Sequence, residues 1–274
     1  MQFQQFIEQI QNLFPLDSAL KDDVVGLQVN TKNPELENVL VAYEINKQVI
    51  EEAITNKASL IICYHPLIFR PLQKLDFSER VSDLVSDLIR NDIALYCLHT
   101  CYDCNEKGSN YLLAQKLGLE NPEFIEKSDK YEGKGFGIIA NTNKKIDLNV
   151  LVQKCEEIFC SPIRFNEIGL NKEISRIAII AGSGMSYYSK VESLKADAFI
   201  TADVKYHDFH MADGKLNLID PGHYEMEQFI VSGIYEILND LNLQVNIKKS
   251  NTYTNPVRYS NGDYKNMQIK NLMN

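Results

Sequence analysis

Apolar positions along the first half of the chain follow two alternating spacings. Segments in which apolar side chains recur every three or four positions are predicted to be helices: 3–14, 47–57, 78–90 and 110–117. Short and nearly continuous apolar runs are predicted to be buried strands: 39–43, 59–63 and 93–98. We therefore expect strands and helices to alternate along this half.

The same alternation returns after a more polar stretch. Further strands are predicted at 136–140, 176–181, 198–201, 217–219 and 242–247, and further helices at 147–159, 206–212 and 224–239. The polar stretch 120–134 is predicted to cross between two lobes. Residues 1–125 with 217–274 would form the first lobe, and 126–216 the second. The pattern predicts an α/β fold: a two-lobed subunit with largely parallel sheets flanked by helices.

Composition narrows the class of protein. With 274 residues and a formal net charge of −9, the chain is unfavourable for general nucleic-acid binding, which needs a basic face. The longest uncharged apolar stretch, Ala58 to Phe69, is too short to span a bilayer, so we expect no membrane partner. The six cysteines are too sparse for a disulfide scaffold, and no basic segment precedes an apolar run near residue 1. We expect a reduced, cytoplasmic protein.

Histidines and carboxylates gather just after predicted strands. His65, His99 and His223 each follow one of these strands, as does Asp203, and Asp103 lies four residues beyond His99. Ligands of parallel α/β sheets bind outside the carboxyl ends of the strands. These side chains are therefore candidates for one common site.

A metal ion is the ligand that this set of side chains favours. His223 and Glu227 are four residues apart, so they share one helix face and can hold an ion together. Imidazole with carboxylate suits zinc, iron or manganese better than calcium. The competing interpretation is a set of capping histidines and a surface His/Glu pair, and spacing alone leaves both interpretations open.

Two other motifs are weaker. Cys101 and Cys104 form a lone CxxC without a second pair, which favours non-ligating thiols. Gly182-Ser183-Gly184 follows a predicted strand but lacks the rest of a dinucleotide or P-loop motif, so we expect a structural turn.

A set of motifs nevertheless spans nearly the whole chain in a fixed order: Asp23-Val-Val-Gly-Leu-Gln28, Leu60-Ile-Ile-Cys-Tyr-His-Pro-Leu-Ile-Phe69, Leu98-His-Thr-Cys-Tyr-Asp103, Ala196-Asp-Ala-Phe-Ile-Thr-Ala-Asp-Val-Lys-Tyr-His-Asp208 and Asn217-Leu-Ile-Asp-Pro-Gly-His-Tyr-Glu-Met-Glu227. Together with Gly182-Ser-Gly184 and Thr254-Asn-Pro256, this set resembles the GTP cyclohydrolase 1 type 2 family, the Ngg-one-interacting-factor-three-like proteins.

The resemblance implies a two-lobed α/β subunit, a toroidal homohexamer and a dinuclear divalent-metal site between the lobes. It implies His65 and Asp103 as ligands of one ion, His223 as a ligand of the other, and Glu227 as a bridge between the two. The family's remaining ligand is the first histidine of a His-His-Pro motif, and Tyr64 stands there in this chain.

Tyr64 changes what is expected of the second ion. A neutral phenol is a poor ligand, and ionising it (free pKa about 10) requires the metal to lower its pKa. Phenolate ligation, a water in the vacant position and a weakly bound second ion remain open. We expect a weakened or altered second site, with one or two ions of zinc, iron or manganese per subunit.

The reaction that the resemblance implies is hydrolysis of the guanine imidazole ring of GTP by a metal-activated water. His99 or His207 would act as the catalytic acid, and Lys205 and Arg70 would bind the triphosphate. Two alternatives stay open: another metal-dependent nucleotide phosphoesterase, and a non-catalytic metal-binding regulatory or interaction protein.

Overall fold

The computed structural model of the chain describes residues 1–167 and 173–260. The chain forms two compact units, each built around its own sheet. The first unit consists of residues 1–102 and 230–256, and the second contains residues 103–229 and 257–260, apart from 168–172. No helix in the described ranges is both long and apolar enough to cross a membrane.

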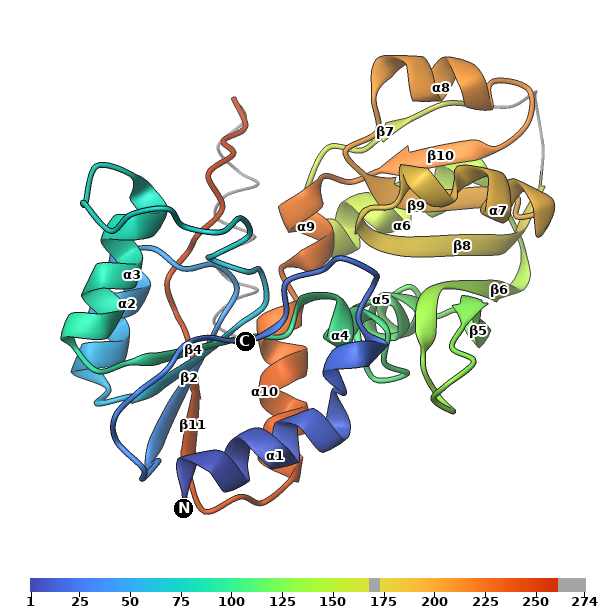
Figure 1. Ribbon diagram of the computed structural model, residues 1–274. Helices are drawn as coiled ribbons and strands as arrows, with labels where there is room; N and C mark the ends of the chain where they lie inside the picture. Colours follow the sequence, from blue (N-terminus) through green and yellow to red (C-terminus); the bar gives the residue numbers. More distant parts are fainter. Residues whose placement is uncertain (168–172, 261–274) are drawn as a thin grey trace. The chain divides into compact units, whose positions relative to one another are not determined.

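The first unit contains a five-stranded sheet in the order β1-β4-β3-β2-β11 (Figure 1). Its strands are β1 (Gly26–Val29), β2 (Asn38–Ala42), β3 (Leu60–Cys63), β4 (Ala94–Cys97) and β11 (Asn246–Lys249). All neighbouring strands pair in parallel except β1, which runs antiparallel to β4. Every residue of β3 and β4 is buried, as expected of central parallel strands covered on both faces.

Helices cover both faces of the first sheet (Figure 1). They are α1 (Phe3–Leu13), α2 (Lys47–Thr55), α3 (Arg80–Arg90) and α10 (Ile230–Asp240), with a short 3-10 turn at Leu16–Ser18. Helices α2 and α3 pack on one face, where Leu40, Ile61 and Leu95 from neighbouring strands form the core. The Asn46 side chain caps α2 by accepting a hydrogen bond from the Val49 N–H.

The second unit contains a six-stranded sheet in the order β5-β6-β8-β9-β10-β7. Its strands are β5 (Glu120–Lys127), β6 (Gly135–Asp147), β7 (Arg164–Phe165), β8 (Glu173–Ser183), β9 (Ala198–Ala202) and β10 (Asn217–Asp220). Strands β8, β9 and β10 are parallel, whereas β5, β6 and β7 are antiparallel to their neighbours. The prediction of largely parallel sheets therefore holds for the first unit only, because the second sheet is mixed.

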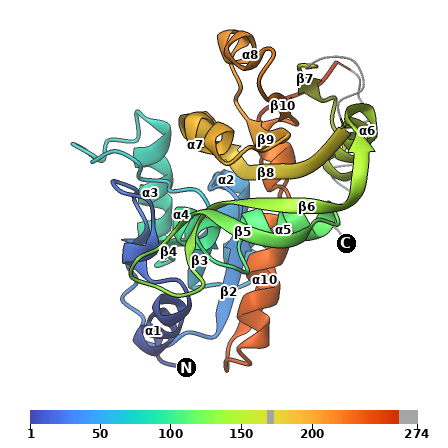
Figure 2. The same cartoon turned by 90° about the vertical axis from the view of Figure 1, so that its right-hand side faces the viewer.

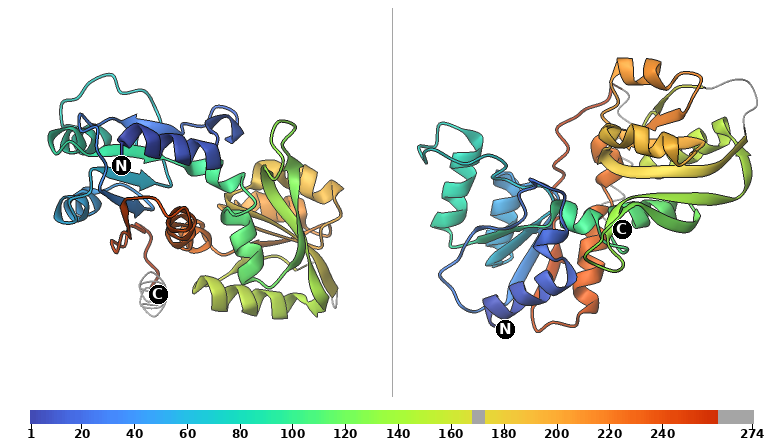
Figure 3. Two further views of the ribbon diagram at one scale, coloured as in Figure 1. Left: turned by 90° about the horizontal axis from the view of Figure 1, so that it is seen from below. Right: turned by 45° about the vertical axis from the view of Figure 1, so that its right-hand side comes forward.

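Helices α5 (Ser109–Lys116) and α6 (Leu148–Phe159) pack on one face of the second sheet (Figure 3). Three further helices belong to this unit: α7 (Tyr188–Ser193), α8 (Tyr206–Ala212) and α9 (His223–Glu227), with a 3-10 turn at Met185–Tyr187. The short helix α4 (His99–Asp103) leads from the first unit into the second. The core beside α5 and α6 contains Ile138, Ile177 and Ile200.

Three predicted segments differ from the structure. The last strand, expected over 242–247, is β11 and begins only at Asn246. The polar stretch 120–134 begins with strand β5, which pairs antiparallel with β6 at the edge of the sheet (Figure 2). Most β5 side chains are exposed, so the strand lacks the apolar run by which buried strands are recognised. The helix expected over 224–239 is two helices, α9 and α10. The Gln228 side chain donates to the Glu225 carbonyl at 2.8 Å, and a continuous helix needs that carbonyl for its own ladder.

Candidate metal centre

The parallel strands of the first unit end in register at one edge. Ala42 pairs with Cys63, and Cys63 with Cys97, so the residues that follow these three strands lie side by side. Those residues include His65 after β3 and His99 after β4. The centroids of the two imidazole rings are 5.3 Å apart, so the structure brings these two side chains together at one edge of the sheet.

His65 and Tyr64 are held by neighbours from the adjacent strand end. His65 Nδ1 lies 2.9 Å from Glu44 Oε1. The Tyr64 ring stacks on Tyr43, with centroids 5.9 Å apart and an interplanar angle of 18°. Tyr64 is fully buried, so aromatic packing fixes the position of its ring.

His99 forms the second histidine–carboxylate pair of this unit. Its Nδ1 lies 2.7 and 2.9 Å from the two carboxylate oxygens of Asp23, and Thr100 Oγ1 donates to the same carboxylate. Burial acts to raise the pKa of Asp23, but the hydrogen bonds and charge of His99, with Thr100 and the Val24 N–H, outweigh it and lower the pKa. The His99 backbone has φ of +33°, a conformation that non-glycine residues rarely adopt and that is concentrated at functional sites.

The second unit places its own histidine between two carboxylates. His223 Nδ1 lies 2.7 Å from Asp203 Oδ2, and its Nε2 lies 3.1 Å from Glu227 Oε2. Asp203 follows β9, whereas His223 and Glu227 stand on successive turns of α9, which follows β10. Burial lowers the pKa of His223, but the two carboxylates outweigh that effect and raise it to about 10. Glu227 is 2% exposed and the His223 side chain is 35% exposed, so the pair combines a buried carboxylate with a half-buried imidazole.

One arrangement is common to these three histidines. Each presents Nδ1 to a carboxylate, Glu44, Asp23 or Asp203, and an ionised carboxylate can only accept a hydrogen bond. The Nδ1 atom must therefore carry a proton, so Nε2 is the nitrogen that would coordinate a metal ion. At His223, that ion would replace the Nε2 proton that faces Glu227. Histidines that bind metal ions are oriented in this way. His223 and Glu227 together offer an imidazole nitrogen and a carboxylate oxygen on one helix face, so their chemistry fits a divalent ion.

Gly182 makes room for this pair. Its φ is +65°, and a Cβ atom there would lie 2.5 Å from Glu227 Oε1 and 3.2 Å from His223 Nε2. Glycine is therefore favoured for two reasons, the backbone conformation and the close approach of the two side chains. The sequence shows the Gly182-Ser-Gly184 motif but does not reveal this role, because the clash involves residues 41 and 45 positions later.

The remaining predicted site residues lie as follows. Asp103 is buried at the end of α4, where its carboxylate accepts a hydrogen bond from Ser109. His207 is exposed on α8, with its ring 5.4 Å from that of Tyr206. Lys205 is exposed at the N-cap of α8, and Arg70 is exposed beyond β3. The roles expected of these four residues stay predictions.

A cavity of about 350 Å³ in the second unit opens beside His223. Asp203 and Glu225 line it together with Arg164, which comes from the short strand β7. Arg164 is not among the site residues predicted from the sequence, because the segment that carries it resembles no motif. The only available signal was its basic charge.

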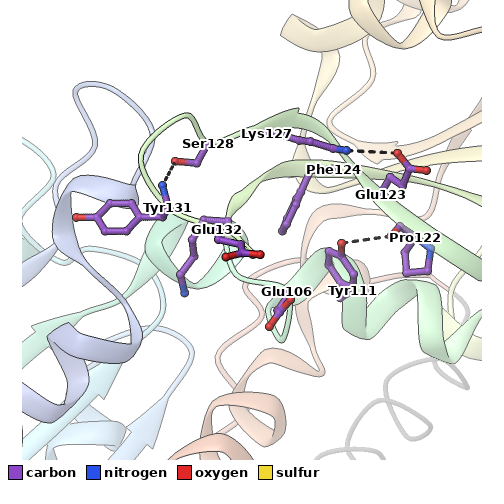
Figure 4. Close-up of a pocket in the computed structure, with 11 residues that line it drawn as sticks. Glu106, Tyr111, Pro122, Glu123, Phe124, Lys127, Ser128, Tyr131 and Glu132 are labelled. Carbon is purple, nitrogen blue, oxygen red and sulfur yellow. Dashed lines mark hydrogen bonds and ion pairs between the residues drawn. The ribbon is translucent and has the colours of Figure 1, made fainter.

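Another cavity, of about 380 Å³, lies at the β5–β6 hairpin (Figure 4). Its lining includes Tyr111, which donates to the Pro122 carbonyl at 3.3 Å, and the ion pair of Lys127 with Glu123 at 3.5 Å. None of its lining residues is a histidine or one of the predicted site residues. We therefore place the candidate metal centre elsewhere in this unit, at His223.

The fold and these histidine–carboxylate pairs define a mixed α/β protein with a candidate metal-binding group. The chain belongs to the Duf34/NIF3 (NGG1p interacting factor 3) family, whose model matches residues 1–256. The resemblance recognised in the sequence is therefore confirmed.

Curated relatives and solved structures agree with this assignment. The chain is 36% identical to a GTP cyclohydrolase 1 type 2 homolog of Lactococcus lactis, over 93% of this chain and 98% of the relative. It is 29% identical to a protein of Helicobacter pylori named GTP cyclohydrolase 1 type 2, over 92% and 96%. A hypothetical protein of Staphylococcus aureus has a similar structure, with a TM-score of 0.86 and 27% identity over 94% of this chain and 99% of that one.

Proposed function

We propose that this protein is a divalent-metal-dependent hydrolase, resembling GTP cyclohydrolase 1 type 2, that opens the guanine imidazole ring of GTP. The observation that carries the proposal is the His223–Glu227 pair, oriented by Asp203 and given space by Gly182. The names of the curated relatives support the choice of substrate.

In this proposal, His65 and Asp103 bind one ion, His223 binds the other and Glu227 bridges the two. Such ions activate water near neutral pH and stabilise developing negative charge. Glu44 orients His65 by accepting a hydrogen bond from Nδ1–H, and Asp203 orients His223 in the same way. The ions would be zinc, iron or manganese.

Ring opening also needs an acid to protonate the departing nitrogen. We assign this step to His99, because the Asp23 carboxylate orients its ring through Nδ1 and also stabilises the protonated imidazole. His207 is the alternative acid, although it is exposed on α8. Lys205 and Arg70 are proposed to meet the triphosphate, and the subunit is proposed to act within a toroidal homohexamer.

Release of formate from GTP is the test of this function. The purified protein is assayed with added zinc, manganese or iron, and formate is expected from the wild type but not from His223→Ala or Glu227→Ala. His210→Ala is the matched control, because this histidine is exposed on α8 and has no assigned role. Formate release that persists in both site variants would refute the metal-dependent mechanism. Phosphate release instead would identify a phosphoesterase, and no turnover would identify a binding protein.

Tyr64 is proposed to weaken the second ion site. Its buried ring packs between Tyr43 and Tyr102. Close packing therefore opposes a movement of this ring that would let another ligand take its place at the ion. Metal analysis should find less than two tightly held ions per subunit in the wild type and a gain in Tyr64→His. Two tightly held ions that are unaffected by Tyr64→Phe would contradict this proposal.

A further inference from the structure

The cavity beside His223 contains an anchored arginine at the carboxyl ends of β9 and β10. Asp203 follows β9, and Pro221 follows β10. Apolar and aromatic side chains, among them Ile163, Tyr224 and Val257, form much of the remaining wall. A ligand in this cavity would therefore lie next to the imidazole that is proposed to bind metal.

Arg164 is fixed by the strand that carries it. Strand β7 pairs antiparallel with β10, and Arg164 stands directly opposite Asp220 in the register. Its Nη2 donates to the Asp220 carboxylate and, at 3.0 Å, to the Val204 carbonyl. The guanidinium also lies over the Phe209 ring, 5.8 Å from its centroid. The side chain is thus held in one orientation before any ligand arrives.

The other edge of the guanidinium remains available. Arginine has five N–H donors, and the two contacts above use Nη2 only. Within residues 1–167 and 173–260, no protein acceptor bonds Nε or Nη1 of Arg164, and the side chain is 60% exposed. A planar edge of this kind matches the oxygens of a phosphate or carboxylate group, often with two hydrogen bonds.

The carboxylates of the cavity are occupied in other ways. Asp220 is buried and also accepts hydrogen bonds from the Val204 and Gly222 N–H groups, at 3.1 and 2.9 Å. Asp203 is bonded to His223, and Glu225 is buried against Gly222. The guanidinium of Arg164 is therefore the charged group of this cavity best placed to meet a ligand from solvent.

We propose that Arg164 anchors the substrate by binding an anionic group, a phosphate or a carboxylate, next to His223. The proposal rests on the proposed function only for the identity of the neighbouring reaction centre. The sequence predicted Lys205 and Arg70 as the substrate-binding residues, and the proposal adds Arg164 to them.

Binding of simple anions tests this role. Isothermal titration calorimetry of the protein as purified uses pyrophosphate, succinate, GTP and guanosine as probes. Their affinities distinguish binding of a phosphate group, of a carboxylate group and of the base. Arg164→Gln should weaken binding of GTP and of the preferred anion by roughly 10- to 100-fold, and guanosine binding should not change. The affinity of Arg164→Lys for the anions should lie between those of the wild type and Arg164→Gln, because lysine keeps the positive charge but lacks the planar edge.

Arg90→Gln is the matched control. The Arg90 side chain is also 60% exposed, pairs with a carboxylate (Asp87, at 3.4 Å) and covers a phenylalanine ring (Phe77), but it lies on α3 of the first unit. It should leave binding of every probe unchanged, and thermal unfolding of each variant checks that the fold is retained.

The possible failures are distinguishable. Anion binding that does not depend on Arg164, or wild-type protein that binds none of the anions, overturns the assignment of Arg164. Formate release with an unchanged KM for GTP in Arg164→Gln also overturns it and leaves the proposed function standing. Arg164-dependent anion binding without any formate release supports the anchor and rejects the proposed function.

Discussion

The two units use the same histidine–carboxylate device on sheets of different construction. In the first unit, His65 and His99 follow neighbouring strands of a sheet that is parallel apart from its β1 edge. In the second, His223 follows β10 within the parallel half of a mixed sheet. The antiparallel strands β5, β6 and β7 lead to no histidine. The comparison shows that the parallel carboxyl edge, and not the overall topology, positions this chemistry.

The carboxylates behind His99 and His223 differ in exposure. The Asp23 side chain behind His99 is 6% exposed, whereas that of Asp203 behind His223 is 53% exposed. A buried carboxylate contributes to the stability of its unit, while an exposed one chiefly orients its histidine. The five predictions below compare the two units, beginning with the largest expected effect.

Removing one imidazole from each unit tests whether both contribute to the metal site. His223→Ala should weaken zinc binding by at least roughly 100-fold, because it removes a ligand. His65→Ala should have an effect of the same order if the proposed ligand set is correct. Competition with a chromogenic chelator measures both. Normal zinc affinity in His65→Ala would restrict the site to the second unit.

A methyl group at Gly182 should disrupt the second unit's pair. Gly182→Ala adds a Cβ 2.5 Å from Glu227 Oε1 at a residue with φ of +65°. We therefore expect the unfolding free energy to fall by about 3 kcal/mol and metal binding to be lost. Gly214→Ala is the control, because φ is +70° there and no atom lies within 4 Å of the added Cβ. It should cost about 1 kcal/mol. Equal losses in urea unfolding for the two variants would show that no crowding occurs.

Neutralising the two carboxylates should separate stability from orientation. Asp23→Asn should lower the unfolding free energy by about 2 kcal/mol at pH 7, since it removes a buried, charged acceptor. Asp203→Asn should lower it by less than about 1 kcal/mol while weakening zinc binding roughly 10-fold. Urea titrations monitored by circular dichroism, together with the chelator assay, measure these effects.

The Asp23 effect should also depend on pH in a definite direction. Its pKa is lower in the folded protein than the ordinary 3.8, so the stabilisation is complete above about pH 4 and is lost as pH falls through the folded value. The difference between wild type and Asp23→Asn should therefore shrink below about pH 4. A difference that grows on acidification would rule out this account of Asp23.

The smallest expected effect is a difference in thiol reactivity between the cores of the two units. All six cysteines are buried. Burial raises the pKa of Cys97 in the first unit well above its usual value, and that of Cys155 in the second to about 12. A disulfide reagent at pH 8 should therefore react slowly with the native protein. After unfolding, it should react rapidly with all six thiols. Faster labelling of one of these two cysteines, located by mass spectrometry, would show that its unit opens more readily.

The sequence predicted the elements that form buried cores and missed those at the edges. Strands β3 and β4 and helices α2, α3 and α6 lie within two residues of their predicted bounds, because their apolar patterns are strong. Strand β5 and the two-residue strand β7 carry few buried side chains, so hydrophobic periodicity could not reveal them.

The site was predictable to a similar extent. Histidines after parallel strands could be identified from local spacing, and so could the His223–Glu227 pair. Asp203, which orients His223, was also among the candidates, but the partners of His99 and His65 were not, because Asp23 and Glu44 come from distant segments that only the folded sheet brings to them. Arg164 escaped detection for the same reason, since its partner Asp220 is 56 residues away.

The glycine beside the His223–Glu227 pair has a practical consequence for reading genomes. If that pair binds metal, a larger residue at position 182 of this chain would have to shift Glu227, so this one position bears on the geometry of the whole centre. Chains of this fold that retain the histidines but carry a larger residue there are the ones in which metal binding should be measured first.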